Sequence, residues 1–218
     1  MKDVLLSIDC SNRWTCLGLA VNGSAVSERN VDLGRAQAAR LPLITEELLD
    51  ERGLKIHDLT VMAVTVGPGY FTGIRIGIAY AAALAFSLGI GVVPLSSLEA
   101  LLRAVPEWNT GLKVPLIAAS RELAFSSAWL NGKQVLDEKE RTYGSLEEEL
   151  KAFSKEAAMW GVRDARLFAC EKEARVNFLK NPSGAAMAAL AMEKIGNMLK
   201  PDELRARYLR EPGLGRVS

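Results

Sequence analysis

A glycine-rich loop is the segment of this chain whose residue types most suggest chemistry. Residues 61–66 form an apolar, β-branched run, Gly67, Gly69 and Gly73 follow it, and a helix pattern begins at once. This order of strand, glycine turn and helix is how α/β proteins bring backbone N–H groups to a phosphate. The loop lacks the Gly-Lys-Ser/Thr ending of a P-loop, however, and its spacing misses the dinucleotide fingerprint by one residue. Two interpretations stay open, an anion nest or a tight structural connection that positions the helix.

A second candidate is the carboxylate that ends the first apolar run. Asp9 follows residues 4–8, and Ser11 comes two residues later. A carboxylate at a strand end suits a hydrated Mg²⁺ ion beside phosphate oxygens. Against that, the turn has no glycine to admit a phosphate, and Trp14 crowds it. The alternative is a structural aspartate that caps the hairpin through its own backbone.

Other catalytic residue types are scarce. The single histidine, His57, excludes a multi-histidine metal site, and without a Gly-x-Ser-x-Gly motif a Ser-His-Asp triad is not expected. We therefore expect His57 to have a surface or packing role. The cysteines Cys10, Cys16 and Cys170 contain no Cys-x-x-Cys pair, which predicts buried thiols in a reducing cytosol.

Composition indicates a folded protein of modest size. The 218 residues are 49% hydrophobic and 24% charged, enough to bury a core in one large domain or two small lobes. The net charge is +1, whereas a protein that holds nucleic acid alone is usually more basic. RNA could still be the substrate of a complex that contains this chain.

The order of expected elements suggests the fold. The first half predicts strands at 4–9, 14–21, 25–31, 61–66 and 91–93, and helices at 35–52, 74–88 and 98–102, the last capped by Ser96 or Ser97. Pro42 marks the start of the first helix or a kink in it. After a linker at 106–113, the second half predicts strands at 114–119, 124–130, 134–136 and 166–169, helices at 145–153 and 185–199, and an exposed arginine-rich tail around Tyr208. Pro115 makes the strand at 114–119 an edge strand or a late-starting one.

A strand meander followed by alternating helices and strands, begun again in the second half, predicts an α/β protein. The pattern suggests an actin-like ATPase (ASKHA, ribonuclease H-like) fold with two lobes. We place the lobes at 1–105 and 106–218, with the last helix free to pack back on the first lobe. The uncharged stretch 76–98 is long enough to cross a bilayer, but Gly89, Gly91 and Pro94 interrupt it, so a buried helix, a turn and a strand are expected instead of a membrane span.

The helix after the glycine loop carries a stripe of small residues. Gly73, Gly77 and Ala81 recur every four residues, with Ala82 and Ala85 beside them. Small side chains on one stripe let another element come close. The stripe faces either the protein's own sheet or a partner helix.

Four segments together resemble the TsaB (YeaZ) family, in order and along the full chain. Residues 67–77 are similar to that family's Gly-Pro-Gly-Ser-Phe-Thr-Gly-Leu-Arg-Ile-Gly motif, with Tyr70 for serine and Ile74 for leucine. Residues 8–11 resemble its opening Ile-Asp-Thr-Ser, residues 94–98 its Val-Ser-Ser-Leu, and residues 207–210 its closing Pro-x-Tyr-Leu-Arg. Two places depart from the family: its His-Ser-Glu is absent before Leu41-Pro42, and its Asp-Ala-Arg is Ala119-Ser120-Arg121 here, so the second lobe is the weaker part of the resemblance.

The resemblance implies a non-catalytic dimerisation and scaffold subunit. It would support a TsaD-like catalytic partner, which carries a metal-binding histidine pair, in forming N6-threonylcarbamoyladenosine at adenosine 37 of tRNA, together with a TsaE-like ATPase. It implies a cytoplasmic chain that binds no cofactor alone, with ATP and a metal ion held by the partner subunits, and tRNA met through the complex. Whether the isolated chain forms a homodimer stays open.

For the partner interface we expect the first two helices to form a bundle with the catalytic subunit. The expected interface residues are Gly73, Arg75, Ile76, Gly77, Tyr80, Ala81, Leu43 and Glu47. The alternative function is an autonomous actin-like ATPase or small-molecule kinase that uses Asp9 and the glycine loop. A metallopeptidase is disfavoured, because the chain has one histidine and no zincin motif.

Overall fold

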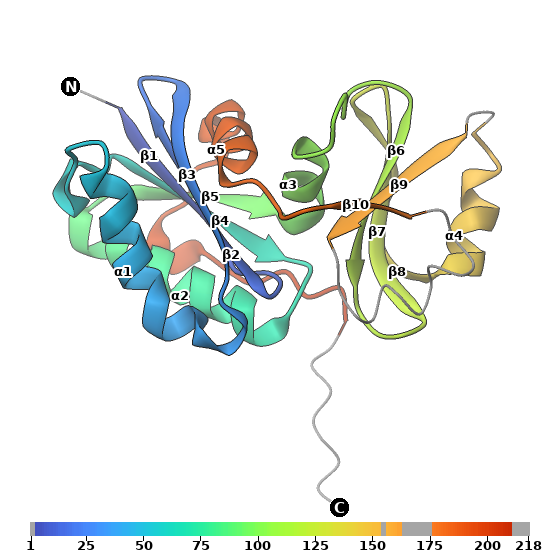
Figure 1. Cartoon of the computed structure of the whole chain (residues 1–218), viewed down its shortest axis with the longest axis horizontal. Helices are drawn as coiled ribbons and strands as arrows, with labels where there is room; N and C mark the ends of the chain where they lie inside the picture. The colour runs from blue at the N-terminus through green and yellow to red at the C-terminus, as the bar shows by residue number, and fades with distance from the viewer. Residues whose placement is uncertain (1–2, 154–155, 163–175, 211–218) are drawn as a thin grey trace, which may run out of the picture.

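The computed structural model describes residues 3–153, 156–162 and 176–210, in which two five-stranded sheets stand side by side (Figure 1). The elements of the first half are β1 (Val4–Asp9), β2 (Trp14–Val21), β3 (Ser24–Asp32), α1 (Gln37–Asp50), β4 (Val61–Gly67), α2 (Phe71–Leu88), β5 (Gly91–Ser96) and α3 (Ser97–Arg103). Those of the second half are β6 (Leu112–Ala118), β7 (Leu123–Leu130), β8 (Lys133–Thr142), α4 (Tyr143–Leu150), β9 (Ala157–Val162), β10 (Val176–Leu179) and α5 (Gly184–Glu193).

The two sheets have the same topology. The first has the order β3-β2-β1-β4-β5 and the second β8-β7-β6-β9-β10, so each is a three-strand meander extended by two strands on its other side. In both sheets the meander pairs are antiparallel and the added strands are parallel. This repeat of one unit confirms the predicted two-lobed actin-like α/β fold. The linker carries the chain from one sheet to the other.

Helices cover both faces of the first sheet. In β1, Leu6 and Ile8 pack with α1 and α2, whereas Leu5 packs with α5. Successive side chains of a strand point to opposite faces, so a strand that is covered on both faces reads as a continuous apolar run. This explains why β1 is entirely buried.

The last helix, α5, belongs to the first sheet although it comes from the end of the chain. A Cβ atom on Gly18 of β2 would lie 1.8 Å from the Gly184 carbonyl oxygen, and one on Gly184 would lie 1.9 Å from the Leu17 carbonyl oxygen. The backbones of α5 and β2 therefore touch. Desolvation opposes ionisation of Glu28 on β3, but hydrogen bonds from the Ala185 N–H and the Ser183 hydroxyl outweigh it and lower the pKa of Glu28. The carboxylate thus sits at the positive end of α5.

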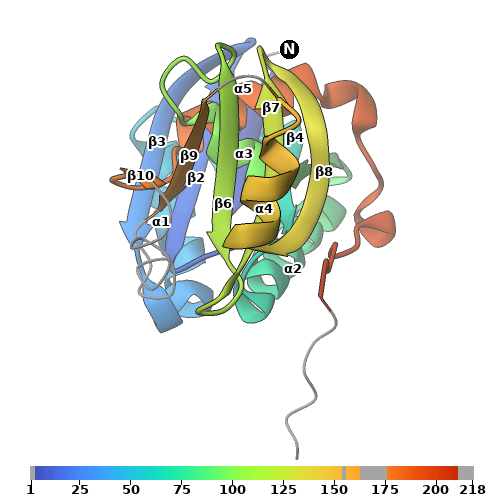
Figure 2. The same cartoon turned by 90° about the vertical axis from the view of Figure 1, so that its right-hand side faces the viewer.

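In the second lobe, α4 covers one face of the sheet (Figure 2). Its Tyr143, Leu146 and Leu150 are buried there. The other face turns toward the first lobe, where Ile117 and Phe125 pack with Leu98 and Leu101 of α3 in a separate cluster. The helix α3 thus lies between the two sheets.

Several predicted elements are confirmed and others need correction. The Asn-Gly hairpins at 22–23 and 131–132 have positive φ at both residues, as a type I′ turn requires, and the Ser96 hydroxyl accepts a hydrogen bond from the Glu99 N–H to cap α3. The helix at 185–199 ends at Glu193, because the chain leaves it to exchange two backbone hydrogen bonds between Leu199 and Val92. The predicted strand at 166–169 lies outside the described residues.

The interpretation of Pro115 as a mark of an edge or late-starting strand is wrong. The strand β6 starts at Leu112 and lies between β9 and β7, and Pro115 stands opposite Trp160. Because proline has no N–H to donate, the pairing with β7 is interrupted at 114–115 and resumes at Leu116. The sheet thus accommodates the proline by a local gap.

Candidate functional site

The glycine loop lies directly against the chain's own first hairpin. The Tyr70 N–H donates to the Ser11 carbonyl oxygen at 2.6 Å. A Cβ atom on Gly69 would lie 2.2 Å from that same oxygen, and one on Gly73 would lie 1.9 Å from the Cys10 carbonyl oxygen. These glycines are required because backbone meets backbone. The geometry favours the structural-connection interpretation of the loop.

The stripe of small residues on α2 faces the first sheet. Gly73, Gly77 and Ala81 are buried, and a Cβ atom on Gly77 would be in ordinary contact with Val64 of β4. The prediction that these three residues form the partner interface is therefore corrected: small side chains let α2 lie close to its own β4.

By length and composition alone, α2 is long and apolar enough to cross a bilayer, which is weak evidence for a membrane span.

The other five expected interface residues are not fully buried, although Ile76 and Tyr80 also pack against the core of the first lobe. Arg75, Leu43 and Glu47 are exposed, and Ile76 and Tyr80 are half-buried. The helices α1 and α2 lie side by side on the same face of the first sheet (Figure 1). Burial raises the pKa of the Tyr80 hydroxyl, and a hydrogen bond with Thr45 of α1 partly offsets this effect. The two helices therefore form one continuous surface.

That surface contains small and apolar side chains besides the predicted ones. Ala79 and Ala83 are exposed on α2, and Phe86 at the end of the same helix is 78% exposed. An exposed phenylalanine on a helix face is typical of an interaction site when other apolar groups lie beside it. The signal in the sequence was the 3.6-residue period, which places 79, 83 and 86 opposite the buried stripe.

Asp9 closes the first hairpin. Its Oδ1 accepts hydrogen bonds from the Ser11 N–H at 2.8 Å and from the Thr65 hydroxyl at 2.6 Å. Burial raises the pKa of Asp9 above its ordinary value, and these hydrogen bonds only partly offset the effect. The capping interpretation of Asp9 is confirmed.

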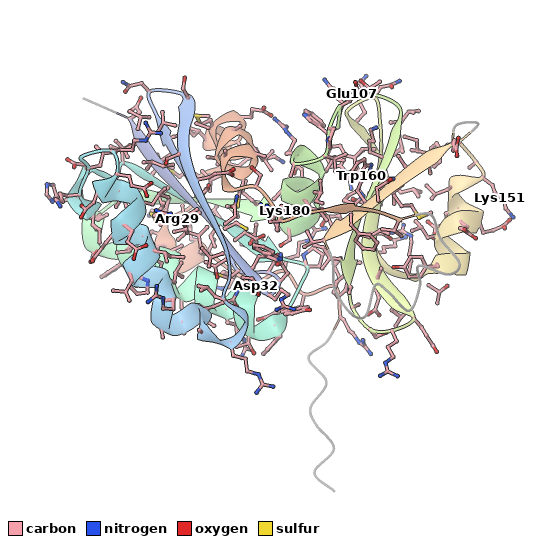
Figure 3. All side chains as sticks on the ribbon, viewed as in Figure 1. Arg29, Asp32, Glu107, Lys151, Trp160 and Lys180 are labelled. Atoms are coloured by element: carbon pink, nitrogen blue, oxygen red, sulfur yellow. The ribbon has the colours of Figure 1, made fainter. Side chains whose placement is uncertain are left out.

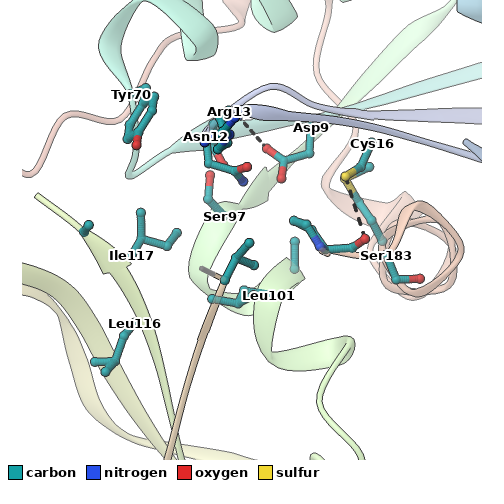
Figure 4. A pocket seen from close by; sticks show the side chains of 16 residues that line it. Asp9, Asn12, Arg13, Cys16, Tyr70, Ser97, Leu101, Leu116, Ile117 and Ser183 are labelled. Carbon is teal, nitrogen blue, oxygen red and sulfur yellow. Dashed lines mark hydrogen bonds between the residues drawn. The ribbon is translucent and has the colours of Figure 1, made fainter. Parts of the chain in front are cut away.

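A small cavity lies between the lobes beside Asp9. Asp9, Ser97 of α3 and Ile117 of β6 line it (Figure 4). The hydroxyl oxygen of Ser97 is buried without a hydrogen-bond partner among the described residues, and Ser97 borders this cavity. Its volume of about 30 Å³ admits one or two water molecules and is far below that of a ligand pocket.

The segment 204–210, which we call the strap, crosses the glycine loop. The Arg207 N–H donates to the Val66 carbonyl oxygen at 2.7 Å, and a Cβ atom on Gly67 would lie 2.4 Å from the Arg207 carbonyl oxygen. The predicted exposure is confirmed for Arg207, Tyr208 and Arg210, but the segment is not a loose tail, because Leu209 packs with the cluster between the lobes. The only signal for this role was the match of residues 207–210 to a family motif.

The strap also joins α2 to the second lobe. The Tyr208 ring stacks on Phe71 at 4.9 Å, and Arg75 lies 3.7 Å from the centre of the Phe71 ring and donates to the Tyr208 hydroxyl at 3.0 Å. On the other side, Arg207 pairs with Glu138 at 2.8 Å and Arg210 pairs with the Glu140 carboxylate at 3.4 Å. Both acids lie on β8, so the strap holds the lobes together.

His57, Cys10 and Cys16 form no candidate site with the other described residues. His57 is 79% exposed beside Asp58. Cys10 and Cys16 are buried, and desolvation together with the nearby Asp9 charge raises the pKa of the Cys10 thiol to about 12. Cys170 lies outside the described residues. Within the part of the chain that the structure covers, no three His, Cys, Asp or Glu side chains gather where they could hold a metal ion.

Comparison with known families gives a match over most of the chain. The family model described as "TsaD: tRNA N6-adenosine threonylcarbamoyltransferase" matches residues 32–198. The tRNA threonylcarbamoyladenosine biosynthesis protein TsaB of Bacillus subtilis is 30% identical over 125 residues, covering 57% of this chain and 54% of that protein. The protein of the same name from Haemophilus influenzae is 31% identical over 140 residues, covering 63% and 56%. The chain thus spans about half the length of the curated relatives it matches.

Solved structures agree on the fold. A Pseudomonas aeruginosa protein described as similar to peptidase YEAZ superposes with a TM-score of 0.80 at 24% identity, covering 95% of this chain and 100% of that one. YeaZ from the same organism superposes with a TM-score of 0.73 at 22% identity over the same shares. At these identities the likeness concerns the fold.

Proposed function

Since this chain belongs to the TsaB (YeaZ) family, we propose that it is the dimerisation and scaffold subunit of a tRNA threonylcarbamoyl transferase. It would support a TsaD-like catalytic partner in forming N6-threonylcarbamoyladenosine at adenosine 37 of tRNA. The observation that carries the proposal is the outward face of α1 and α2. That face is continuous and partly apolar, and it lies on the opposite side of the sheet from α5.

The residues that could hold a nucleotide or a metal ion are either hydrogen-bonded within the chain or absent from its sequence. Asp9 is engaged by Ser11 and Thr65 in a cavity of about 30 Å³, and the chain has one histidine, which cannot form a metal-binding pair. We therefore propose that ATP and the metal ion belong to the partner subunits and that this chain alone binds no cofactor. A TsaE-like ATPase would join the pair, and tRNA would be met through the complex.

The outward face has the character of a helical interface. Arg75, Ile76 and Tyr80 of α2 and Leu43 and Glu47 of α1 stay the expected contact residues. The exposed alanines Ala79 and Ala83 allow a partner helix to come close, because the distance between helix axes follows side-chain size at the contact. Phe86 supplies an aromatic anchor of the kind enriched in interfaces. A cytoplasmic location fits this role, since buried free thiols are stable in a reducing compartment.

Assembly with the TsaD-like subunit of the same genome tests the proposal. Co-expressed chains should elute as a heterodimer in size-exclusion chromatography with light scattering, which also reports whether the isolated chain forms a homodimer. Ala79→Arg and Ala83→Arg should each raise the dissociation constant by roughly 100-fold, about 3 kcal/mol, through overlap and a buried charge. Ala152→Arg, at an exposed alanine after α4, is the matched control and should assemble normally.

Two outcomes would contradict the proposal. If the unaltered chain forms no heterodimer, the scaffold function fails. If both α2 variants fold and assemble as well as the control, the interface lies elsewhere. Calorimetric titration with Mg-ATP tests the alternative, because micromolar binding with turnover by the isolated chain would favour an autonomous ATPase or kinase.

A further inference from the structure

A broad groove opens between the lobes beside the strap. It encloses about 810 Å³ and is bordered by the β1–β2 turn, the β3–α1 connection, the glycine loop, the β6–β7 end and the strap. Among the residues that the structure describes, every charged side chain that lines it is an arginine: Arg13, Arg35, Arg207 and Arg210. The described lining thus contains no carboxylate. The groove therefore differs from the cavity at Asp9 in size and in charge.

Three of these arginines form ion pairs with carboxylates, and their side chains nevertheless stay exposed to solvent. Arg13 pairs with Asp32 (labelled in Figure 3) at 2.7 Å, and Glu138 and Glu140 hold Arg207 and Arg210. The paired arginine side chains stay 51–55% exposed. A guanidinium has five N–H donors, so the carboxylates that pair with Arg207 and Arg210 leave other donors for a second anion.

The other charges beside the groove are positive and therefore favour the binding of anions. Arg35 is exposed and has no ion pair within the described part of the chain. Arg75 adds a further positive charge beside Phe71. The helix α2 also begins in the groove, and its N-cap residue Tyr70 provides no side-chain cap, so the positive end of the helix dipole faces the same space.

Aromatic rings border the arginines. Tyr70, Phe71 and Tyr208 line the groove, and Phe71 and Tyr208 stack with Arg75 into a fixed platform. Tyr208 is 37% exposed. Arginines that follow a groove together with accessible aromatic rings are the features with which proteins bind single-stranded nucleic acid, where phosphates meet guanidinium groups and bases stack on rings.

The composition of the groove disfavours a Mg-nucleotide. Magnesium is held through carboxylates as well as phosphates, and the lining within residues 3–153, 156–162 and 176–210 supplies no carboxylate. Asp9 belongs to the neighbouring cavity and is occupied by Ser11 and Thr65. A polynucleotide carries a single charge at each phosphate, which one arginine neutralises without a metal ion.

We propose that this groove binds a single-stranded segment of RNA, with phosphates on Arg35 and Arg210 and a base stacked on Tyr208. The choice of RNA rests on the proposed function, which places the chain in a complex that acts on tRNA. The scaffold subunit then contributes directly to holding the substrate, in addition to supporting its catalytic partner.

Fluorescence anisotropy with the intact chain tests this inference. The probe is a fluorescein-labelled, unmodified tRNA transcript, titrated at several salt concentrations between about 0.05 and 0.3 M. The double variant Arg35→Gln/Arg210→Gln should weaken binding about 25-fold at 0.1 M salt and reduce the slope of log K against log salt by about 1.4, because each single-strand phosphate contact contributes about 0.7. Arg52→Gln is the matched control: it is an exposed arginine just after the C-terminal end of α1 and should bind like the unaltered chain.

The results separate this inference from the proposed function. Unchanged affinity and slope in the double variant, an equal loss in the Arg52 control, or no binding by the unaltered chain up to about 0.1 mM at low salt would each overturn it. Displacement of the RNA by micromolar Mg-ATP would overturn it as well. Heterodimer formation is measured in parallel, so assembly without RNA binding refutes only the groove, and RNA binding without assembly refutes only the scaffold function.

Discussion

The contact between α5 and β2 gives the sharpest prediction for stability. An added Cβ at Gly184 would lie 1.9 Å from the Leu17 carbonyl oxygen, whereas ordinary contacts begin at 3.4 Å. In Gly184→Ala the helix must therefore move outward by about 1.5 Å. Neither group can rotate away, because the obstacle is backbone.

The expected loss follows from the usual costs of overpacking. Such substitutions cost about 1–3 kcal/mol, and a fixed backbone obstacle places this one near the upper end. Alanine's better helix propensity returns at most about 1 kcal/mol, so we expect a net loss of about 2–3 kcal/mol. For a chain of this size that lowers Tm by roughly 5–10 °C. Thermal unfolding followed by circular dichroism, with urea unfolding for the free energy, measures it.

A double-mutant cycle and a control make the test specific. Gly18→Ala creates the reciprocal overlap, with its Cβ 1.8 Å from the Gly184 carbonyl oxygen, and one movement of α5 relieves both. The double variant should therefore lose clearly less stability than the sum of the two single variants. Gly144→Ala on α4 meets nothing within 4 Å and should be neutral or slightly stabilising. An unchanged Tm in Gly184→Ala, or strict additivity with Gly18→Ala, would refute the reasoning.

Four further predictions concern buried and capping groups. Asp9→Ala should cost roughly 2–4 kcal/mol in urea unfolding, because it strands two buried donors. Because burial raises the pKa of Asp9, the unaltered chain should lose stability as pH rises through the raised pKa of Asp9, and Asp9→Asn should lack this loss. A pH-independent difference in stability between the two proteins would contradict this prediction. Glu28→Gln should lose about 0.5 kcal/mol at neutral pH, and because the pKa of Glu28 is lowered the difference should disappear as pH falls below 4.5; a difference that persists in acid would exclude the capping role. In a Cys170→Ser background, iodoacetamide at pH 8 should leave Cys10 unmodified until the chain unfolds, as mass spectrometry would show, and rapid labelling of the native chain would contradict the thiol pKa of about 12.

The element order was predictable because the local signals were strong. The run Val4–Asp9, the Asn22-Gly23 turn and the Ser96 cap each act through nearby backbone, so sequence patterns locate them to within a residue or two. The strand β9 and the position of β6 were not predictable in the same way. The placement of Pro115 in a central strand depends on which strands flank it, and that is a property of the whole sheet.

The candidate site shows the same division. The sequence identified the glycine loop and the small stripe on α2, since their residue types are unusual at that spacing. It could not say which way the stripe faces, because a period of four residues is the same for a helix on its own sheet and for one on a partner. Burial of Gly73, Gly77 and Ala81 decided that.

By itself, the sequence determined the family motif, the two-lobed α/β order and the shortage of catalytic groups. Those properties depend on residue identity and on neighbours along the chain. Only the tertiary structure decided that the outward side of α2 is the free one, that the strap closes over the glycine loop, and that Arg13, Arg35 and Arg210 meet in one groove. Residues so far apart in sequence come together because the two lobes pack against each other, and no local sequence pattern encodes that packing.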